Sequence, residues 1–149
     1  MLFEDVTIAV QPCAAAPKDE SPVLCFQPGQ VLLVGKESVP CLPVYRQVKP
    51  LLPEGTVLIA LLTADGQAVF TPDPLGDEVI PQGNGLSYGP MRLFREMDCR
   101  SGAVLTAAHH LWQWMRRNRF CGGCGGRMEH DGAERALRCL ACGQVNYPM

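Results

Sequence analysis

Two Cys-x-x-Cys-Gly units near the end of the printed sequence constrain the fold more than any other feature. They contain Cys121 with Cys124 and Cys139 with Cys142, and fourteen residues separate the two pairs. Each pair can reach one ion from a tight turn, and the glycine that follows permits the positive φ that turns backbone amides toward the sulfurs. Four thiolates in this pattern are typical of a closed, tetrahedral zinc site. The sequence therefore predicts a structural zinc ribbon at residues 120–149.

Other uses of the cysteines are less consistent with the sequence. A redox Cys-Gly-Gly-Cys motif would need only one pair and a βαβ setting, so the second matched pair favours zinc. His130 lies between the pairs, but four cysteines already complete a structural site without it. The remaining cysteines have no paired spacing, and we expect reduced thiols packed mostly as small apolar side chains. They are Cys13, Cys25, Cys41 and Cys99.

The composition sets the broad class of protein. Of 149 residues, 47% are hydrophobic and 19% are charged, which is typical of a globular chain and not of a disordered one. A net charge of −2 gives no general attraction to nucleic acid. No apolar run approaches the ~18 residues that a membrane span needs, and the first residues lack the features of a signal peptide. We therefore expect a cytoplasmic protein without a membrane partner.

The order of patterns predicts an α+β chain in three parts: a mostly β domain at 1–98, a linking helix at 99–119 and the ribbon. Short apolar runs bounded by turn residues recur at 6–10, 23–26, 31–34, 57–62 and 68–70. The best hairpin covers 57–70, because Asp65-Gly66 supplies the positive φ of a tight turn. Residues 11–22 and 71–90 are expected to be loops.

A helical stripe follows the β domain. Ser101 is the predicted N-cap, and arginines in the last turn complement the negative end of the helix dipole. Trp114 lies off the stripe, so it marks either a subunit contact or a contact with the ribbon. The apolar positions at helical spacing are Val104, Leu105, Ala108, Leu111, Trp112 and Met115. We expect this stripe to pack in the core, and we expect His109 and His110 on the helix surface.

One combination of motifs is more specific than a bare ribbon. Residues 112–128 are followed by Cys139-x-x-Cys-Gly and by Tyr147-Pro148. This segment reads Trp-x-Trp-Met-Arg-Arg-Asn-Arg-Phe-Cys-Gly-Gly-Cys-Gly-Gly-Arg-Met. Together they resemble the NADH pyrophosphatase (NAD diphosphatase) branch of the Nudix superfamily. The resemblance is carried by the chain from Ser101 onward. It implies a degenerate Nudix-like β domain, then the helix and the ribbon, with a catalytic Nudix domain beginning after the Tyr-Pro.

The catalytic Nudix signature itself is missing from this sequence. Its Arg-Glu-x-x-Glu-Glu core places carboxylates on one helical face, where they hold divalent cations against a pyrophosphate. The stretch 95–98, Arg-Glu-Met-Asp, imitates its start, but Cys99 and Arg100 occupy the positions of the two glutamates. The resemblance therefore implies Mg²⁺ or Mn²⁺ on the catalytic domain, and we expect no hydrolysis by the chain as given.

The resemblance also implies substrate-contacting positions in a homodimer that cuts NAD(H) into AMP and nicotinamide mononucleotide. These positions are Glu134, Tyr147 and Arg92, with Lys36 as a looser match. A glutamate can accept from ribose hydroxyls, a tyrosine can stack on a base, and an arginine suits phosphate. As alternatives, Glu134 is a solvated ribbon residue, Tyr147 packs on its neighbour, and Arg92 and Lys36 are ordinary surface cations.

A second function class is a stand-alone zinc-ribbon module that binds nucleic acid or a protein partner. Six arginines around the ribbon favour it, whereas three nearby acidic residues and the scarcity of aromatic side chains weigh against it. The arginines are Arg116, Arg117, Arg119, Arg127, Arg135 and Arg138, and the acidic residues are Glu129, Asp131 and Glu134. Otherwise the expected nucleic-acid partner is only a capped RNA, as substrate of the complete enzyme.

Overall fold

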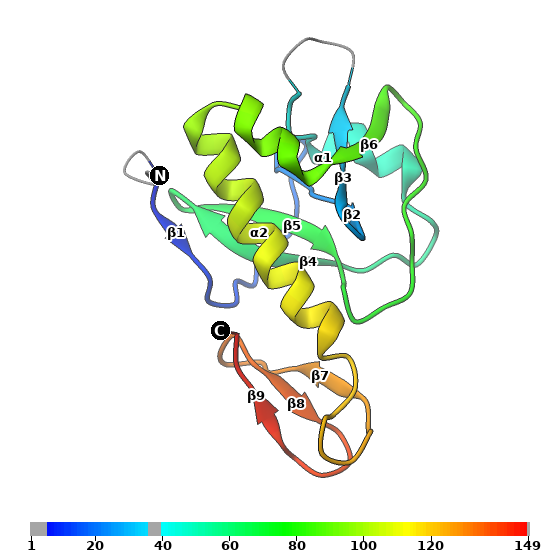
Figure 1. Cartoon of the computed structure of the whole chain (residues 1–149), viewed down its shortest axis with the longest axis vertical. Coiled ribbons are helices and arrows are strands. Elements are labelled where there is room, and N and C mark those ends of the chain that lie inside the picture. The colour runs from blue at the N-terminus through cyan, green and yellow to red at the C-terminus, as the bar shows by residue number, and fades with distance from the viewer. Residues whose placement is uncertain (1–5, 36–39, 149) are drawn as a thin grey trace.

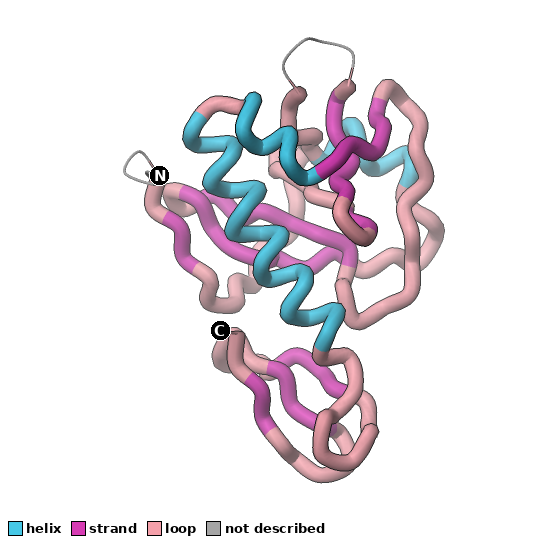
Figure 2. The backbone as a smooth tube through the Cα atoms, viewed as in Figure 1, coloured by secondary structure: helices cyan, strands magenta, loops and turns pink. Residues whose placement is uncertain are grey.

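The computed structural model describes residues 6–35 and 40–148, and its mixed strands and helices confirm the predicted α+β class. The strands are β1 Ile8–Ala9, β2 Phe26–Gln27, β3 Gln30–Val34, β4 Leu58–Ala64, β5 Gln67–Pro72, β6 Leu86–Pro90, β7 Met128–His130, β8 Leu137–Cys139 and β9 Val145–Asn146. The helices are α1 Tyr45–Val48 and α2 Cys99–Arg117, with 3-10 turns η1 Lys49–Leu51 and η2 Met91–Glu96. The long helix α2 crosses the β4–β5 hairpin, and the ribbon lies beyond its C-terminal end (Figure 1, Figure 2).

Three antiparallel three-stranded sheets organise the strands, in the orders β1-β4-β5, β2-β3-β6 and β7-β8-β9. The predicted hairpin at 57–70 is confirmed as β4 and β5. Its turn has φ of 50° at Asp65 and 81° at Gly66, as a two-residue hairpin turn requires. The segment 22–24 connects the first two sheets, because Leu24 N donates to Phe70 O at 2.8 Å and Phe70 N donates to Pro22 O at 2.9 Å.

Part of the predicted loop at 71–90 is wrong, because its last residues form β6. This strand pairs with β3 from Leu86 to Pro90. Its sequence, Leu-Ser-Tyr-Gly-Pro, offers little β-branched or alternating apolar character, and proline at the end of an edge strand removes one ladder donor. Pairing with the buried β3 therefore decides its conformation. The short α1 and η1 also lie outside the predicted elements.

Helix α2 begins at Cys99, as the predicted range 99–119 has it, but its N-cap differs from the predicted one. Asp98, and not Ser101, is the N-cap, because its Oδ1 accepts from Ser101 N at 2.7 Å and its Oδ2 accepts from Ser101 Oγ at 3.1 Å. The predicted stripe is confirmed as core, with Leu105, Ala108 and Met115 fully enclosed and Trp112 partly buried. Trp114 is also buried, and its Nε1 donates to Asn146 Oδ1 on β9 at 2.8 Å.

One hydrophobic cluster runs from the β domain through α2 into the ribbon. It includes Leu61 and Val69 from the hairpin, Leu111 from α2, and Met128 and Leu137 from the ribbon. A second cluster packs on the other side of the hairpin around Phe70, which is 1% exposed. Because the first cluster contains side chains of the β domain, α2 and the ribbon, the ribbon packs against the rest of the chain.

The ribbon is joined to the hairpin by a buried cation. Arg135 is 8% exposed, and its Nη2 donates to Ala60 O and Leu61 O, both at 2.9 Å, while its Nε donates to Val10 O at 2.9 Å. The pairing of β4 with β5 is irregular between Ala60 and Leu62. Such a bulge leaves carbonyls outside the ladder. The guanidinium fork satisfies them, and no carboxylate takes part in these three bonds.

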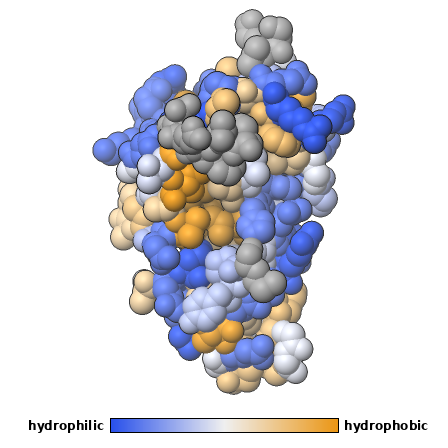
Figure 3. All heavy atoms as spheres, turned by 60° about the vertical axis from the view of Figure 1, so that its left-hand side comes forward, coloured by the Kyte–Doolittle hydropathy of each residue, from blue (hydrophilic) through white to orange (hydrophobic). Residues whose placement is uncertain are grey.

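None of the helices in the described ranges is long and apolar enough to cross a membrane. On the face of the molecule brought forward in Figure 3, apolar side chains form separate patches among hydrophilic ones. The larger exposed apolar side chains of the ribbon are Phe120, Leu140 and Tyr147.

Replacement of Arg135 tests how strongly the ribbon is held. We expect Arg135→Ala to lower the free energy of unfolding by about 2–4 kcal/mol, because it leaves the carbonyls of Val10, Ala60 and Leu61 without this donor. Arg135→Lys should retain only part of the lost free energy of unfolding, since one ammonium group cannot reproduce the hydrogen-bond geometry of the planar guanidinium. Chemical denaturation with zinc present measures the difference.

The matched control is Arg138→Ala in the same ribbon. Arg138 is exposed and pairs with Asp131 at 2.9 Å, so its loss should change stability little. Equal effects of Arg135→Ala and Arg138→Ala would contradict the docking role of Arg135.

Candidate metal centre and nucleotide groove

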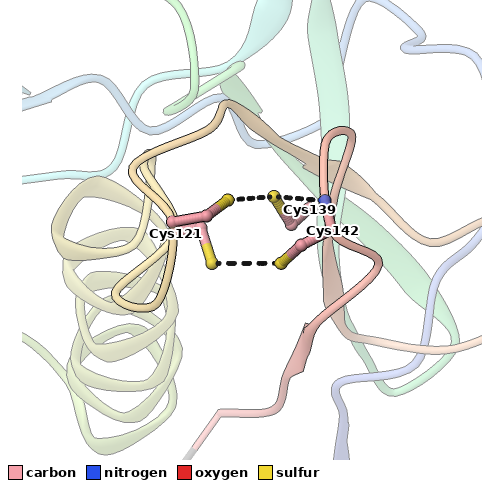
Figure 4. A group of neighbouring side chains, drawn as sticks. Cys121, Cys139 and Cys142 are labelled. Carbon is pink, nitrogen blue, oxygen red and sulfur yellow. Dashed lines mark hydrogen bonds between the residues drawn. The ribbon is translucent and has the colours of Figure 1, made fainter.

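The four cysteines of the ribbon come together at the tips of two turns. Their sulfurs all lie within 4.8 Å of one another. Cys121 Sγ is 3.7 Å from Cys142 Sγ, and Cys124 Sγ is 3.5 Å from Cys139 Sγ. Figure 4 shows the sulfurs of the two turns directed toward a common centre. In the part of the chain that the structure describes, this is the only group of three or more potential metal-ligating side chains.

Each turn also points backbone amides at its own sulfurs. Gly123 N donates to Cys121 Sγ at 3.3 Å, and Gly126 N donates to Cys124 Sγ at 3.4 Å. In the second turn, the amides of Ala141 and Cys142 both donate to Cys139 Sγ at 3.4 Å. The glycines that follow the pairs have φ of 79° at position 125 and 80° at position 143, as the sequence predicts.

These contacts favour thiolates. The amides of Cys142 and Ala141 lower the pKa of Cys139 to about 6 despite desolvation, and amide hydrogen bonds also lower the pKa of Cys121. The Gly126 amide lowers the pKa of Cys124, but the neighbouring thiols of Cys139 and Cys142 raise it to about 11 overall. Thiols this close share protons, and a divalent cation between them displaces those protons.

The arrangement fits zinc. Zinc–sulfur bonds of about 2.3 Å in a tetrahedron place the sulfurs about 3.8 Å apart, close to the separations found here. His130 is not part of the cluster, because its Nε2 lies 2.8 Å from Asp73 Oδ1 at the end of β5. The four cysteines would hold the ion, which would supply cross-linking of the two turns and no open coordination position.

The predicted substrate-contacting residues separate into two groups. Glu134 and Tyr147 are both exposed on the ribbon, and a hydrogen bond from the phenol to the Glu134 carboxylate raises the pKa of Tyr147. Arg92 lies on η2, beside the start of α2, whereas Tyr147 lies near its end. A helix of this length spans about 28 Å, so a single chain does not bring Arg92 to Tyr147. Lys36 lies outside the described residues.

A groove of about 730 Å³ passes between α2 and the end of the ribbon, beside Tyr147. Its walls are His110, Gln113, Trp114, Arg117 and Asn118 from the helix side and Val145, Asn146, Tyr147 and Pro148 from the ribbon side. Sequence reasoning identified only Tyr147 as a site residue here. The spacing of positions 110, 113, 114 and 117 puts them on one helix face and is the signal that could have found the groove.

Most arginines around the ribbon form hydrogen bonds or ion pairs with other groups of this chain. Arg116 Nη1 donates to Pro74 O at 3.0 Å and to Gly76 O at 2.7 Å, and Arg119 pairs with Asp77 at 2.7 Å. Together with Arg127, these side chains hold the loop at 73–77. Arg135 and Arg138 also have the protein partners given above. Within the described ranges, Arg117 alone of the six arginines has no hydrogen bond or ion pair.

Loss of one zinc ligand tests the metal centre. We expect Cys139→Ala to lose zinc and the ribbon structure, because metal binding supplies much of the folding free energy of such a unit. Zinc per chain by atomic emission and ribbon signals by NMR measure this. Cys99→Ala, which removes an exposed thiol outside the cluster, should keep one zinc. One equivalent of zinc with a native ribbon in Cys139→Ala would contradict the assignment.

Comparisons with known proteins agree with this geometry. Residues 116–147 match the family model of the NADH pyrophosphatase zinc ribbon domain. Relatives described as NAD-capped RNA hydrolase NudC from two Pseudomonas aeruginosa strains, LESB58 and PAO1, are 38% identical over 65 residues. That stretch is 43% of this chain and 23% of each relative. NudC from Stutzerimonas stutzeri strain A1501 is 35% identical over 85 residues, which is 56% of this chain and 30% of the relative.

The matched stretches therefore represent less than a third of the length of these relatives. Within that limit, the resemblance predicted from the helix, the arginine cluster and the cysteine spacing is confirmed: the chain carries a zinc ribbon of the NADH pyrophosphatase type and is similar to part of the NudC hydrolases.

Proposed function

We propose that this chain is the N-terminal, non-catalytic portion of an NAD(H) pyrophosphatase, the class of enzyme that cuts NAD(H) into AMP and nicotinamide mononucleotide. Its zinc ribbon would be structural, and its surface would form part of the nucleotide pocket. The match of residues 116–147 to the NADH pyrophosphatase ribbon and the partial similarity to NudC hydrolases support this proposal.

The observation that carries the proposal is the exposed Tyr147, which lines the groove and has the Glu134 carboxylate as a neighbour. Tyr147 is 55% exposed, so one face of its ring is accessible to a base. Stacking of bases on aromatic side chains is tolerant of base identity, which suits a dinucleotide. The Glu134 carboxylate can accept hydrogen bonds from ribose hydroxyls. The Glu134 carboxylate lies close enough to the Tyr147 phenol to raise its pKa, so the two groups are neighbours on the folded ribbon.

The chemistry of hydrolysis would belong to a Nudix domain with Mg²⁺ or Mn²⁺, as the resemblance implies. The stretch that imitates the signature does not form the required carboxylate helix face here. Its Glu96 ends η2, and its Asp98 caps α2. We therefore infer a role in substrate binding and structure for residues 6–35 and 40–148, with the cleavage carried out elsewhere in the complete protein.

We further propose a homodimer. In it, η2 of one copy would approach the ribbon of another copy and so bring Arg92 into the pocket. Zinc thiolates require a reducing compartment such as the cytoplasm. An RNA that carries an NAD cap is a plausible substrate of the complete enzyme, since the similar NudC proteins are described as hydrolases of such RNA.

The alternative of a stand-alone module for nucleic acid or a protein partner has less support. It relied on six arginines around the ribbon, but five of them donate to groups of the protein itself. A basic surface whose guanidinium groups are already bonded offers few phosphate contacts. No observation specifically favours this second function.

Binding of NADH to the zinc-loaded chain tests the proposal. We expect Tyr147→Ala to weaken NADH binding about tenfold or more, since stacking of a base on an aromatic ring contributes about 1–3 kcal/mol. Titration followed by NADH fluorescence and by calorimetry measures the affinity. Glu134→Gln should weaken it to a smaller extent, because the amide keeps one acceptor oxygen.

The matched control is Phe120→Ala, which removes another exposed ring from the ribbon outside the groove. It should leave NADH binding unchanged. If Phe120→Ala and Tyr147→Ala weaken binding equally, or if neither does, the nucleotide role of the Glu134–Tyr147 pair is wrong.

A further inference from the structure

Among the six arginines around the ribbon, Arg117 differs from the others in its contacts with the described residues. Five arginines around the ribbon are fixed by carbonyls or carboxylates, whereas Arg117 is exposed and has no bonded partner within the described ranges. It lies in the last turn of α2, where the helix dipole favours a cation. However, its neighbours Arg116 and Arg119 already meet that preference, and Arg117 differs from them in lining the groove.

Hydrogen bonds between the end of α2 and β9 hold the two walls of the groove together. Trp114 Nε1 donates to Asn146 Oδ1 at 2.8 Å, and Asn146 Nδ2 donates to Asn118 Oδ1 at 3.1 Å. Asn118 Nδ2 in turn donates to Trp114 O at 2.7 Å. This closed set of hydrogen bonds ties the end of α2 to β9. It holds together the two backbone segments that carry Arg117 on one wall and Tyr147 on the other.

Charge is distributed unequally along this groove. Beside the ribbon wall, Glu134 raises the pKa of Tyr147, mainly through a hydrogen bond, and Asp131 adds to this effect while Arg138 opposes it. Glu134 does not itself line the groove, but its carboxylate near Tyr147 offers an acceptor for hydroxyl donors. The opposite wall holds the guanidinium of Arg117, with five N–H donors in a planar fork that matches a phosphate. The two walls thus suit different parts of one nucleotide.

We propose that Arg117 is a specificity-determining residue that binds a phosphate of the nucleotide in this groove. This inference rests on the proposed function, and it adds an orientation. The base stacks on Tyr147, the ribose faces Glu134, and the phosphate lies against the helix wall. The ligand class is a ribonucleotide with a phosphate or pyrophosphate group, and a nucleoside without phosphate loses the contact.

The test compares ligands with and without phosphate on the same zinc-loaded chain. Arg117→Gln should weaken NADH binding about tenfold, because the neutral amide cannot make charge-assisted hydrogen bonds to the phosphate. Adenosine, followed by ligand-observed NMR, should bind the variant and the unaltered chain equally. The affinity of the unaltered chain for NADH should fall with added salt more steeply than that of Arg117→Gln. Arg117→Lys should keep most of that salt dependence.

Arg46→Gln is the matched control, because Arg46 is an exposed helical arginine on α1, paired with Glu20 far from the groove. It should leave NADH binding unchanged. If Tyr147→Ala weakens NADH binding while Arg117→Gln does not, the role of Arg117 is overturned and the proposed function stands. Equal losses for NADH and adenosine in Arg117→Gln also overturn it. If the unaltered chain fails to bind NADH, both proposals fall.

Discussion

The structure depends on one buried cation, the guanidinium of Arg135. The carbonyls of Val10, just after β1, and of Ala60 and Leu61 in β4 accept its hydrogen bonds, and the two in β4 become available because the pairing of β4 is irregular. Burial lowers the pKa of Arg135, but an arginine remains charged in proteins, so the cost of desolvation must be offset by these bonds. The result is a fixed relation between the ribbon and the hairpin. Together with the hydrogen bonds between Trp114, Asn118 and Asn146, this relation gives the groove its place beside α2.

Zinc and Arg135 have complementary roles in this account. The ribbon contributes only Cys121, Met128, Leu137 and Cys139 to the main hydrophobic cluster, too few apolar groups for a core of its own. The metal would therefore fold the ribbon locally, whereas Arg135 and the contacts of Trp114 position the folded ribbon on the rest of the chain. The loop at 73–77 adds further contacts between the β domain and the ribbon, because it accepts hydrogen bonds from Arg116 on α2 and Arg127 in the ribbon.

The sequence predicted the features that local chemistry determines. Cysteine spacing, the Asp65-Gly66 turn and the helical stripe each have a short-range physical cause, and the structure agrees with all three. It could not predict features that depend on distant partners. The sequence places Arg135 in a basic surface, because nothing near it in the sequence reveals the carbonyls that a bulge in β4 presents. The pattern of β6 indicates a loop because only its pairing with β3 defines the strand, and the sequence favours Ser101 as the N-cap although Asp98 provides it. Within the site, Tyr147 was found through a motif, but Arg117 needed the groove to distinguish it from its neighbours.

Hydrogen exchange followed by mass spectrometry, with zinc bound and after its removal by a chelator, tests the central claim most directly. If Arg135 couples the ribbon to the hairpin, zinc removal should increase amide exchange in the ribbon and also around β1 and the irregular part of β4. The increase should be absent near α1, which lies at the end of the molecule away from the ribbon (Figure 1). An increase confined to residues 120–148, with β1 and β4 unchanged, would contradict the account and show a ribbon that folds independently of the domain beside it.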